Sequence, residues 1–138
     1  MRDSELLMES VAWATENEDV ITLRFYEILF DRYPSVRPLF SRESATQAKM
    51  LQDAIVAAIE HMEDAEWLSD TLGAIGATHV DYGVRDEMYP WVGECLVAAL
   101  AEQCGDRWTP QHQDAWVRTY GALQEMALAG AARRRAEG

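Results

Sequence analysis

The chain has few cysteines, few basic residues and no long apolar run. Two cysteines, Cys95 and Cys104, are too few for a disulfide scaffold or a zinc site, so we expect thiols in a reducing cytoplasm. Lysine and arginine number 12 against 24 acidic residues, a net charge of −12. This excess of negative charge disfavours nucleic acid and anionic lipid as partners. No apolar run reaches the roughly 18 residues of a membrane span, and the first ten residues, MRDSELLMES, do not resemble a secretory signal.

The composition indicates one globular domain. Hydrophobic residues make up 49% of the chain, enough for a full core, and neither a repeat nor an interdomain linker interrupts it. We therefore predict a single domain over residues 1–138. The only basic cluster, Arg133 to Arg135, lies near the end of the sequence, where residues 131–138 are expected to form a frayed tail.

Apolar residues recur with the period of an α-helix, and no strand-like alternation persists. We therefore predict an all-α fold. Pro34 and Pro38 interrupt the chain after a helix, Gly105 suits a helix end, and Thr109 with Pro110 suits a helix start. The predicted helices span residues 4–17, 19–33, 44–62, 66–82, 87–104 and 110–130, with a short helical turn near 35–40.

The three histidines do not form a cluster. No Glu-x-x-His pair and no nucleophile elbow occur, so the pattern argues against zinc, di-iron and hydrolytic-triad chemistry. His61 lies near a predicted helix end and His112 in a first helical turn. Both are poorer ligand candidates than His79.

His79 follows Leu72 and Ile75 at helical spacing, one turn before Tyr82 and Gly83 suggest a helix stop. A single inward histidine is compatible with haem, which needs only one protein ligand. Spacing alone leaves a second interpretation open, that of a core histidine with satisfied hydrogen bonds.

Four segments, taken in order, resemble bacterial haemoglobins and the globin domains of flavohaemoglobins. The resemblance implies a globin fold, with about six to seven helices around a haem pocket. The segments are FYEILFDRYPSVRPLF (25–40), QAKMLQDAI (47–55), HVDYGVRDEMYPWVGECLVAAL (79–100) and DAWVRTYGAL (114–123).

The resemblance assigns roles to five residues. His79 would be the proximal ligand of the haem iron, and Phe40 would pack against the porphyrin. Tyr26 and Gln47 would face a bound ligand on the distal side, and Tyr89 would lie behind the proximal histidine. Two structural alternatives stay open. Tyr26 could simply pack against Phe25, Leu29 or Phe30, and Gln47 could be a surface residue at a helix start.

Physical chemistry agrees with these roles. Haem is a large apolar plate, so its walls should be apolar, and Leu51, Ile55, Val84 and Val92 would supply them beside Phe40. Bound O2 carries partial negative charge, so a hydroxyl and an amide N–H in a dry pocket would stabilise it.

The chain departs from the family pattern at two places. Flavohaemoglobins have a glutamate late in the final helix that charges the proximal histidine, and the matching position here is Ala131. Glu125 lies more than a turn earlier and does not replace it. The connection before Gln47 is also shorter than usual.

The expected function is that of a haem-binding globin. The haem would be of the b type, because no Cys-x-x-Cys-His attachment motif occurs. We expect reversible O2 binding and reaction with NO. Nitric oxide dioxygenation would need an external reductase, since the sequence contains no glycine-rich flavin or nicotinamide domain. Oxygen carriage and gas sensing are alternatives, and so is a haem-free globin-fold interaction or sensor domain. The chain would act as a monomer or homodimer.

Overall fold

The computed structural model describes residues 2–16, 20–40 and 44–137, without the side chains of residues 20–22 and 44–48. Every element in this part of the chain is helical, which confirms the all-α prediction. The elements are α1 (Asp3–Ala14), α2 (Val20–Arg32), the 3₁₀ helix η1 (Pro34–Leu39), α3 (Ser44–Glu60), α4 (Ala65–Asp81), α5 (Met88–Cys104), the 3₁₀ helix η2 (Gly105–Arg107) and α6 (Pro110–Ala136).

Local sequence signals mark several helix ends. The carboxylate of Asp64 accepts a hydrogen bond of 3.0 Å from the amide of Trp67 and caps α4. Thr109 caps α6, with Pro110 in its first turn as predicted. Gly105 follows α5 with φ +58°, a left-handed conformation that suits glycine. The predicted helix boundaries agree with those in the structure to within a few residues, except at the end of α6.

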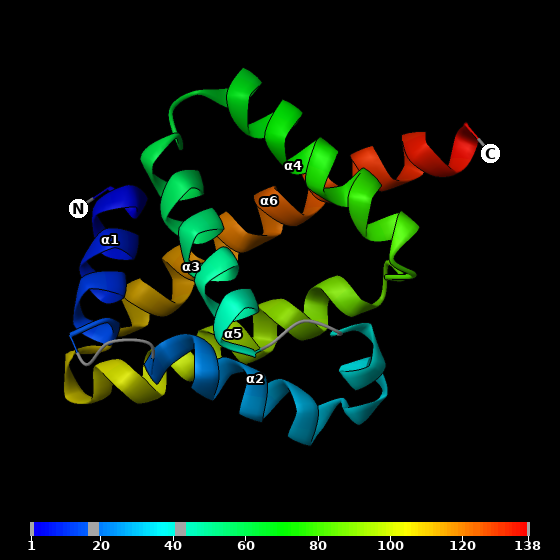
Figure 1. Cartoon of the computed structure of the whole chain (residues 1–138). Coiled ribbons are helices and arrows are strands. Elements are labelled where there is room, and N and C mark those ends of the chain that lie inside the picture. The colour runs from blue at the N-terminus through cyan, green and yellow to red at the C-terminus, as the bar shows by residue number, and fades with distance from the viewer. Residues whose placement is uncertain (1, 17–19, 41–43, 138) are drawn as a thin grey trace.

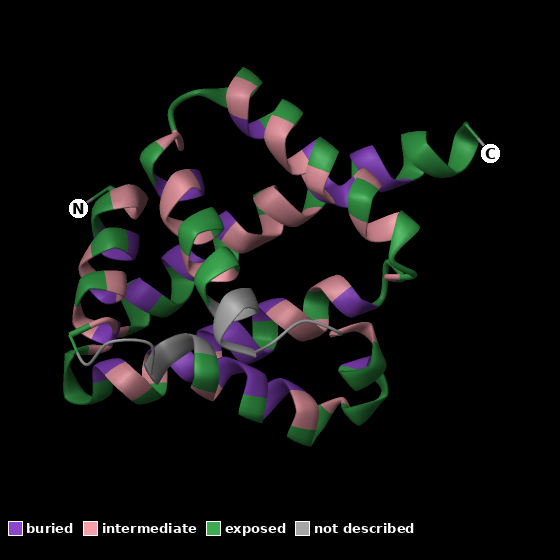
Figure 2. Ribbon diagram, viewed as in Figure 1, coloured by how far each residue is buried: buried purple, intermediate pink, exposed green. Residues whose placement is uncertain are grey.

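The buried core residues come mainly from α1, α2, α5 and the first half of α6 (Figures 1 and 2). α2 packs along α5, and α4 crosses the second half of α6. Phe25, Leu29 and Cys95 are among the largest fully buried side chains. Burial raises the pKa of Cys95 to about 11, so its thiol stays protonated, and both cysteines are buried free thiols.

The crossing of α4 and α6 requires glycine. A Cβ added at Gly76 would overlap the Ala127 carbonyl, and one added at Gly130 would overlap the backbone of Gly73. The two backbones are therefore in direct contact, and any larger residue would push α4 away from α6.

The end of α6 corrects one expectation. Residues 131–138 were expected to fray, but α6 continues to Ala136. Ala131 is buried against the fold. Arg134 and Arg135 form ion pairs of 3.0 and 2.6 Å with Asp81 and Asp86. Contacts with segments far away in sequence thus hold the basic cluster in place.

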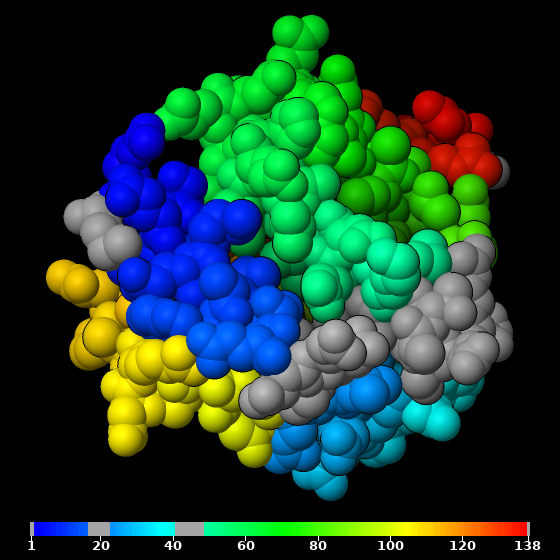
Figure 3. Space-filling model, turned by 60° about the vertical axis from the view of Figure 1, so that its left-hand side comes forward, coloured from blue at the N-terminus to red at the C-terminus, as the bar shows by residue number. Residues whose placement is uncertain are grey.

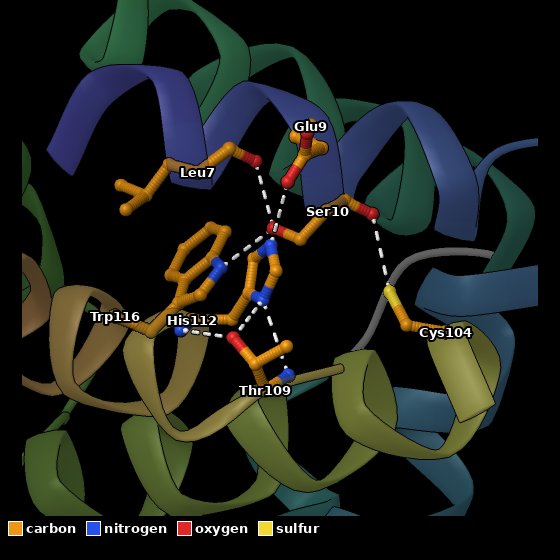
Figure 4. A network of polar contacts seen from close by, with 7 residues as sticks. All are labelled: Leu7, Glu9, Ser10, Cys104, Thr109, His112 and Trp116. Atoms are coloured by element: carbon orange, nitrogen blue, oxygen red, sulfur yellow. Dashed lines mark hydrogen bonds and ion pairs between the residues drawn. The ribbon is translucent and has the colours of Figure 1, made fainter. Parts of the chain in front are cut away.

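A polar network joins α1 to α5 and α6 (Figure 4). The hydroxyl of Ser10, fully buried, accepts a hydrogen bond of 2.8 Å from the indole of Trp116 and donates one of 2.8 Å to the Leu7 carbonyl. The thiol of Cys104 donates to the Ser10 carbonyl at 3.4 Å. Because each buried donor has an acceptor, the network fixes the position of α1 without leaving an unsatisfied group.

His112 belongs to the same network and is structural. Its ring is buried, and its Nδ1 lies 3.1 Å from the Thr109 amide, which donates to it. Nε2 lies 2.9 Å from a carboxylate oxygen of Glu9. Both ring nitrogens are therefore engaged, which supports the interpretation of His112 as a poor ligand candidate.

The face shown in Figure 3 brings α1 and α3 side by side. α3 carries Leu51 and Ile55, both half-buried and packed against the core. A small cavity of about 20 Å³ between these helices is lined by Val11, Ile55 and Trp116, among others. Across the described residues, no helix combines the length and the apolar character needed to cross a membrane.

Candidate functional site

His79 lies in the last turn of α4 with its ring half-buried. Its Nδ1 lies 2.6 Å from the carbonyl oxygen of Ile75, one turn earlier. A carbonyl can only accept a hydrogen bond, so Nδ1 carries the proton and donates it. In the neutral imidazole this leaves Nε2 with a free lone pair, the form in which histidine binds a metal.

Tyr89 lies near His79, and Tyr120 in turn contacts Tyr89. The rings of Tyr89 and His79 have centroids 6.2 Å apart. The hydroxyl of Tyr120 donates a hydrogen bond of 2.6 Å to the backbone carbonyl of Tyr89. The side-chain hydroxyl of Tyr89 is buried and has no hydrogen-bond partner in the part of the chain that the structure describes. Burial raises the pKa of Tyr89, so the hydroxyl remains a donor at neutral pH.

Tyr26 and Phe40, the second pair of predicted site residues, come together in the structure. Their ring centroids are 5.3 Å apart at an interplanar angle of 70°, and Phe30 completes the aromatic group at 5.8 Å from Tyr26 and 5.3 Å from Phe40. Tyr26 is 7% exposed, and burial raises its pKa to about 12. At neutral pH the hydroxyl is therefore protonated and can donate a hydrogen bond.

The predicted apolar wall residues are all partly exposed at the edge of the core. They are half-buried, and each packs against the core cluster: Phe40, Leu51, Ile55, Val84 and Val92. The end of η1 and the turn after α4 also meet, since the side chain of Leu39 lies 3.8 Å from the position that a Cβ of Gly83 would occupy. Apolar side chains that the core leaves half-buried can line an apolar binding slot. Gln47 lies on α3, but its side chain falls outside the described residues.

Two supporting groups were not identified from the sequence. The Ile75 carbonyl could have been found, because it lies four residues before His79 on the same helix face. Tyr120 could not, because its hydrogen bond to Tyr89 joins residues 31 positions apart.

Other ligand arrangements find no support. The ring of His61 stacks on Trp67 with centroids 3.8 Å apart at an angle of 12°. Within the described ranges, no group of three or more His, Cys, Asp and Glu side chains could hold a metal ion.

The residues present fit a haem group on three observations. His79 has one nitrogen fixed by Ile75 and one lone pair available. The buried hydroxyl of Tyr89 is unpartnered among the described residues, and such a group costs about 1–3 kcal/mol unless something bonds to it. The apolar walls match a flat hydrophobic plate.

Comparison with protein families gives a match to the Globin model over residues 23–127. Among individual relatives, a flavohaemoprotein of Pseudomonas putida is 34% identical over 114 residues, which cover 80% of this chain and 29% of that protein. The chain thus spans less than a third of the length of the flavohaemoproteins it matches.

Solved structures show the same likeness. A bacterial globin from Campylobacter jejuni superposes with a TM-score of 0.82 at 29% identity, covering 95% of both chains. An engineered carbene transferase from Rhodothermus marinus, described as a candidate nitric oxide dioxygenase, superposes with a TM-score of 0.84 at 27% identity. That alignment covers 97% of this chain and 94% of the other.

Proposed function

This chain belongs to the globin family, and from that premise we propose that it binds haem b through His79, binds O2 reversibly and converts NO to nitrate when a reductase supplies electrons. The observation that carries the proposal is the hydrogen bond from His79 Nδ1 to the Ile75 carbonyl, 2.6 Å long. It orients the ring and presents Nε2 as the iron ligand. Because the sequence has no Cys-x-x-Cys-His motif, the haem would be of the b type and held without covalent attachment.

Haem, when bound, supplies the iron at which O2 binds and reacts with NO. The chain's part is to exclude water and to place donors. Phe40, Leu51, Ile55, Val84 and Val92 would form the dry walls. The protonated hydroxyl of Tyr26 would donate a hydrogen bond to a bound diatomic ligand, with the amide of Gln47 as a second donor.

Reaction with NO is supported by the relatives. The Pseudomonas putida protein carries flavin and haem in its name, and the Rhodothermus marinus protein is described as a candidate nitric oxide dioxygenase. Conversion of one O2 and one NO to nitrate takes one electron per turnover. A reductase outside these 138 residues would supply it.

Oxygen carriage is the second candidate, and a specific observation favours it. The hydrogen-bond partner of His79 is a neutral carbonyl, and Ala131 stands where flavohaemoglobins have a glutamate. A neutral carbonyl polarises the imidazole less than a carboxylate would, so the ring would donate less electron density to the iron. A weakly donating ligand suits reversible O2 binding more than oxidative chemistry.

The haem assignment is tested by His79→Ala, with His61→Ala as the matched control. We expect the purified protein to contain extractable haem b, the His79 variant to lose or weakly retain haem, and the control to keep it. An unchanged absorption spectrum of the His79→Ala variant would contradict the assignment.

The reaction is tested by stopped-flow mixing of the O2-bound protein with NO. We expect fast formation of nitrate in a single turnover, and sustained turnover only when a reductase and its nicotinamide cofactor are added. If a reductase from the same cell fails to restore activity while O2 binding stays reversible, the carriage role is favoured.

A further inference from the structure

The segment between α4 and α5, residues 82–87, follows directly after the helix that carries His79. The amides of Tyr82 and Val84 donate hydrogen bonds of 3.1 and 3.0 Å to the His79 carbonyl. Gly83 has φ +86°, a left-handed conformation that glycine allows. The turn is therefore tied to the backbone of His79, and a displacement of the turn would move the histidine.

The turn has little packing of its own. Apart from half-buried Val84, residues 82–87 are exposed. Buried apolar contacts alone therefore do not hold its position. Polar contacts with the rest of the molecule therefore add to the packing of Val84 in fixing its position.

Those contacts come from the basic end of α6. Arg134 Nε lies 3.0 Å from Asp81 Oδ1, just before the turn. Arg135 Nη1 lies 2.6 Å from Asp86 Oδ1, near its other end. Arg135 Nη2 also donates to the Val84 carbonyl at 3.4 Å. Two consecutive arginines thus hold both ends of the turn.

We propose that Arg135, assisted by Arg134, is a positioning residue that holds the proximal turn and thereby sets the orientation of His79 toward the haem iron. We refer to Arg134, Arg135, Asp81 and Asp86 as the proximal latch. The inference rests on the proposed function in one respect, that His79 is the iron ligand. The contacts between the arginines and the turn do not depend on it.

The latch acts locally. The side chains of Arg135 and Asp86 are 41% and 59% exposed, and those of Arg134 and Asp81 are 43% and 54% exposed. Such exposed pairs add little to global stability, and salt weakens them. The glycine contact between α4 and α6 keeps the helices together without them. Loss of the latch should therefore loosen the turn without unfolding the protein.

The experiment compares Arg135→Ala with Arg118→Ala. Arg118 lies on the same helix and pairs with Asp3 through two contacts of 2.9 and 3.2 Å, far from the turn. Both variants lose one arginine and one exposed ion pair. We expect faster hydrogen exchange at residues 80–87 in Arg135→Ala alone, with the urea midpoint unchanged in both.

Two measurements on the haem-bound protein report the histidine itself. In Arg135→Ala the iron–histidine stretching band of the ferrous protein should shift or broaden, and haem transfer to an acceptor globin should be roughly three- to fivefold faster. Arg135→Lys should restore much of both, because it keeps the charge. Asp86→Asn should cause the same band shift and faster haem transfer as Arg135→Ala. In the double variant Arg135→Ala/Asp86→Asn, the second substitution should add little to either change.

The outcomes separate the two proposals. Unchanged exchange at residues 80–87 in Arg135→Ala would overturn the latch and leave the haem assignment intact. Faster exchange with an unchanged iron–histidine band would also overturn it, because the turn would then move without affecting His79. A purified protein without haem would refute the function, while the exchange measurement would still decide whether the arginines hold the turn.

Discussion

The partners of single atoms decide what the candidate site can do. His79 keeps a lone pair on Nε2 because its Nδ1 donates to the Ile75 carbonyl at 2.6 Å. Tyr26 keeps its proton because burial raises its pKa to about 12. The first side chain thus has a nitrogen lone pair available, and the second has a proton to donate.

At Tyr26 we predict faster release of O2 when the hydroxyl is removed. A hydrogen bond to a charged acceptor contributes about 1.5–3 kcal/mol, so Tyr26→Phe should raise the O2 dissociation rate roughly ten- to a hundred-fold. The measurement is stopped-flow displacement of O2. Gln47→Leu should show a smaller increase. Little change in both variants would mean that other groups stabilise the ligand.

Tyr89 and Tyr120 form a matched pair for a stability test on haem-free protein. Tyr120→Phe removes the donor to the Tyr89 carbonyl and should cost about 0.5–1.5 kcal/mol of unfolding free energy. Tyr89→Phe removes a buried hydroxyl without a partner in the described part of the chain, so it should leave the unfolding free energy unchanged or raise it by up to about 1–3 kcal/mol. Urea unfolding gives both values. An equal loss in the two variants would show that Tyr89 has a protein partner after all.

Among the helices, the crossing of α4 and α6 determines where His79 lies. Gly73 and Gly76 on α4 meet Ala127 and Gly130 on α6 with their backbones in contact. This close approach carries the last turn of α4, and with it His79, toward the basic end of α6.

We predict that Gly76→Ala destabilises the protein, because the new methyl group would overlap the Ala127 carbonyl. Overpacking of this kind costs about 1–3 kcal/mol or more. Gly121→Ala is the control, since a Cβ there meets nothing within 4 Å. It should be neutral or stabilise the helix by up to about 1 kcal/mol. Equal urea midpoints for the two variants would contradict the close packing.

For the molecule as a whole, the net charge of −12 means that carboxylates repel one another. The stability of the fold therefore depends in part on the few basic side chains that pair with them. Glu94 on α5 accepts a hydrogen bond of 2.7 Å from the Tyr33 hydroxyl and pairs with Arg32 at 2.7 Å. These contacts lower the pKa of Glu94 below its usual 4.5, the hydrogen bond from Tyr33 being the larger cause. They join α5 to the end of α2 and the corner that follows.

The sign of the pH dependence follows from that shift. A lowered folded-state pKa means that Glu94 stabilises the fold above about pH 4.5 and loses this contribution as the pH falls through its folded pKa. We predict that the urea midpoint of the wild-type protein decreases as the pH is lowered from 5 to 3. The urea midpoint of the Glu94→Gln variant should decrease less. Glu60→Gln, an exposed acid at the end of α3, is the control. A wild-type midpoint that stays flat over this range would contradict the prediction.

Much of the fold could be predicted from local sequence. The helical period, the prolines after α2, Gly105 after α5 and the Thr109–Pro110 start of α6 each act through neighbouring residues. Such signals operate within a turn or two of the chain, so they need no knowledge of the rest of the molecule. The half-buried position of His79 in its last helical turn follows in the same way from its spacing after Leu72 and Ile75.

Long-range contacts settled what local patterns left open. Composition predicted that the arginine-rich end would fray, yet Asp81 and Asp86 hold it from about fifty residues away. The meeting of Tyr26 with Phe40 and of Tyr120 with Tyr89 likewise depends on how helices cross. A sequence pattern shows which face of a helix is apolar, but the partner of a charge or hydroxyl is chosen only when packing places two distant segments within hydrogen-bond distance.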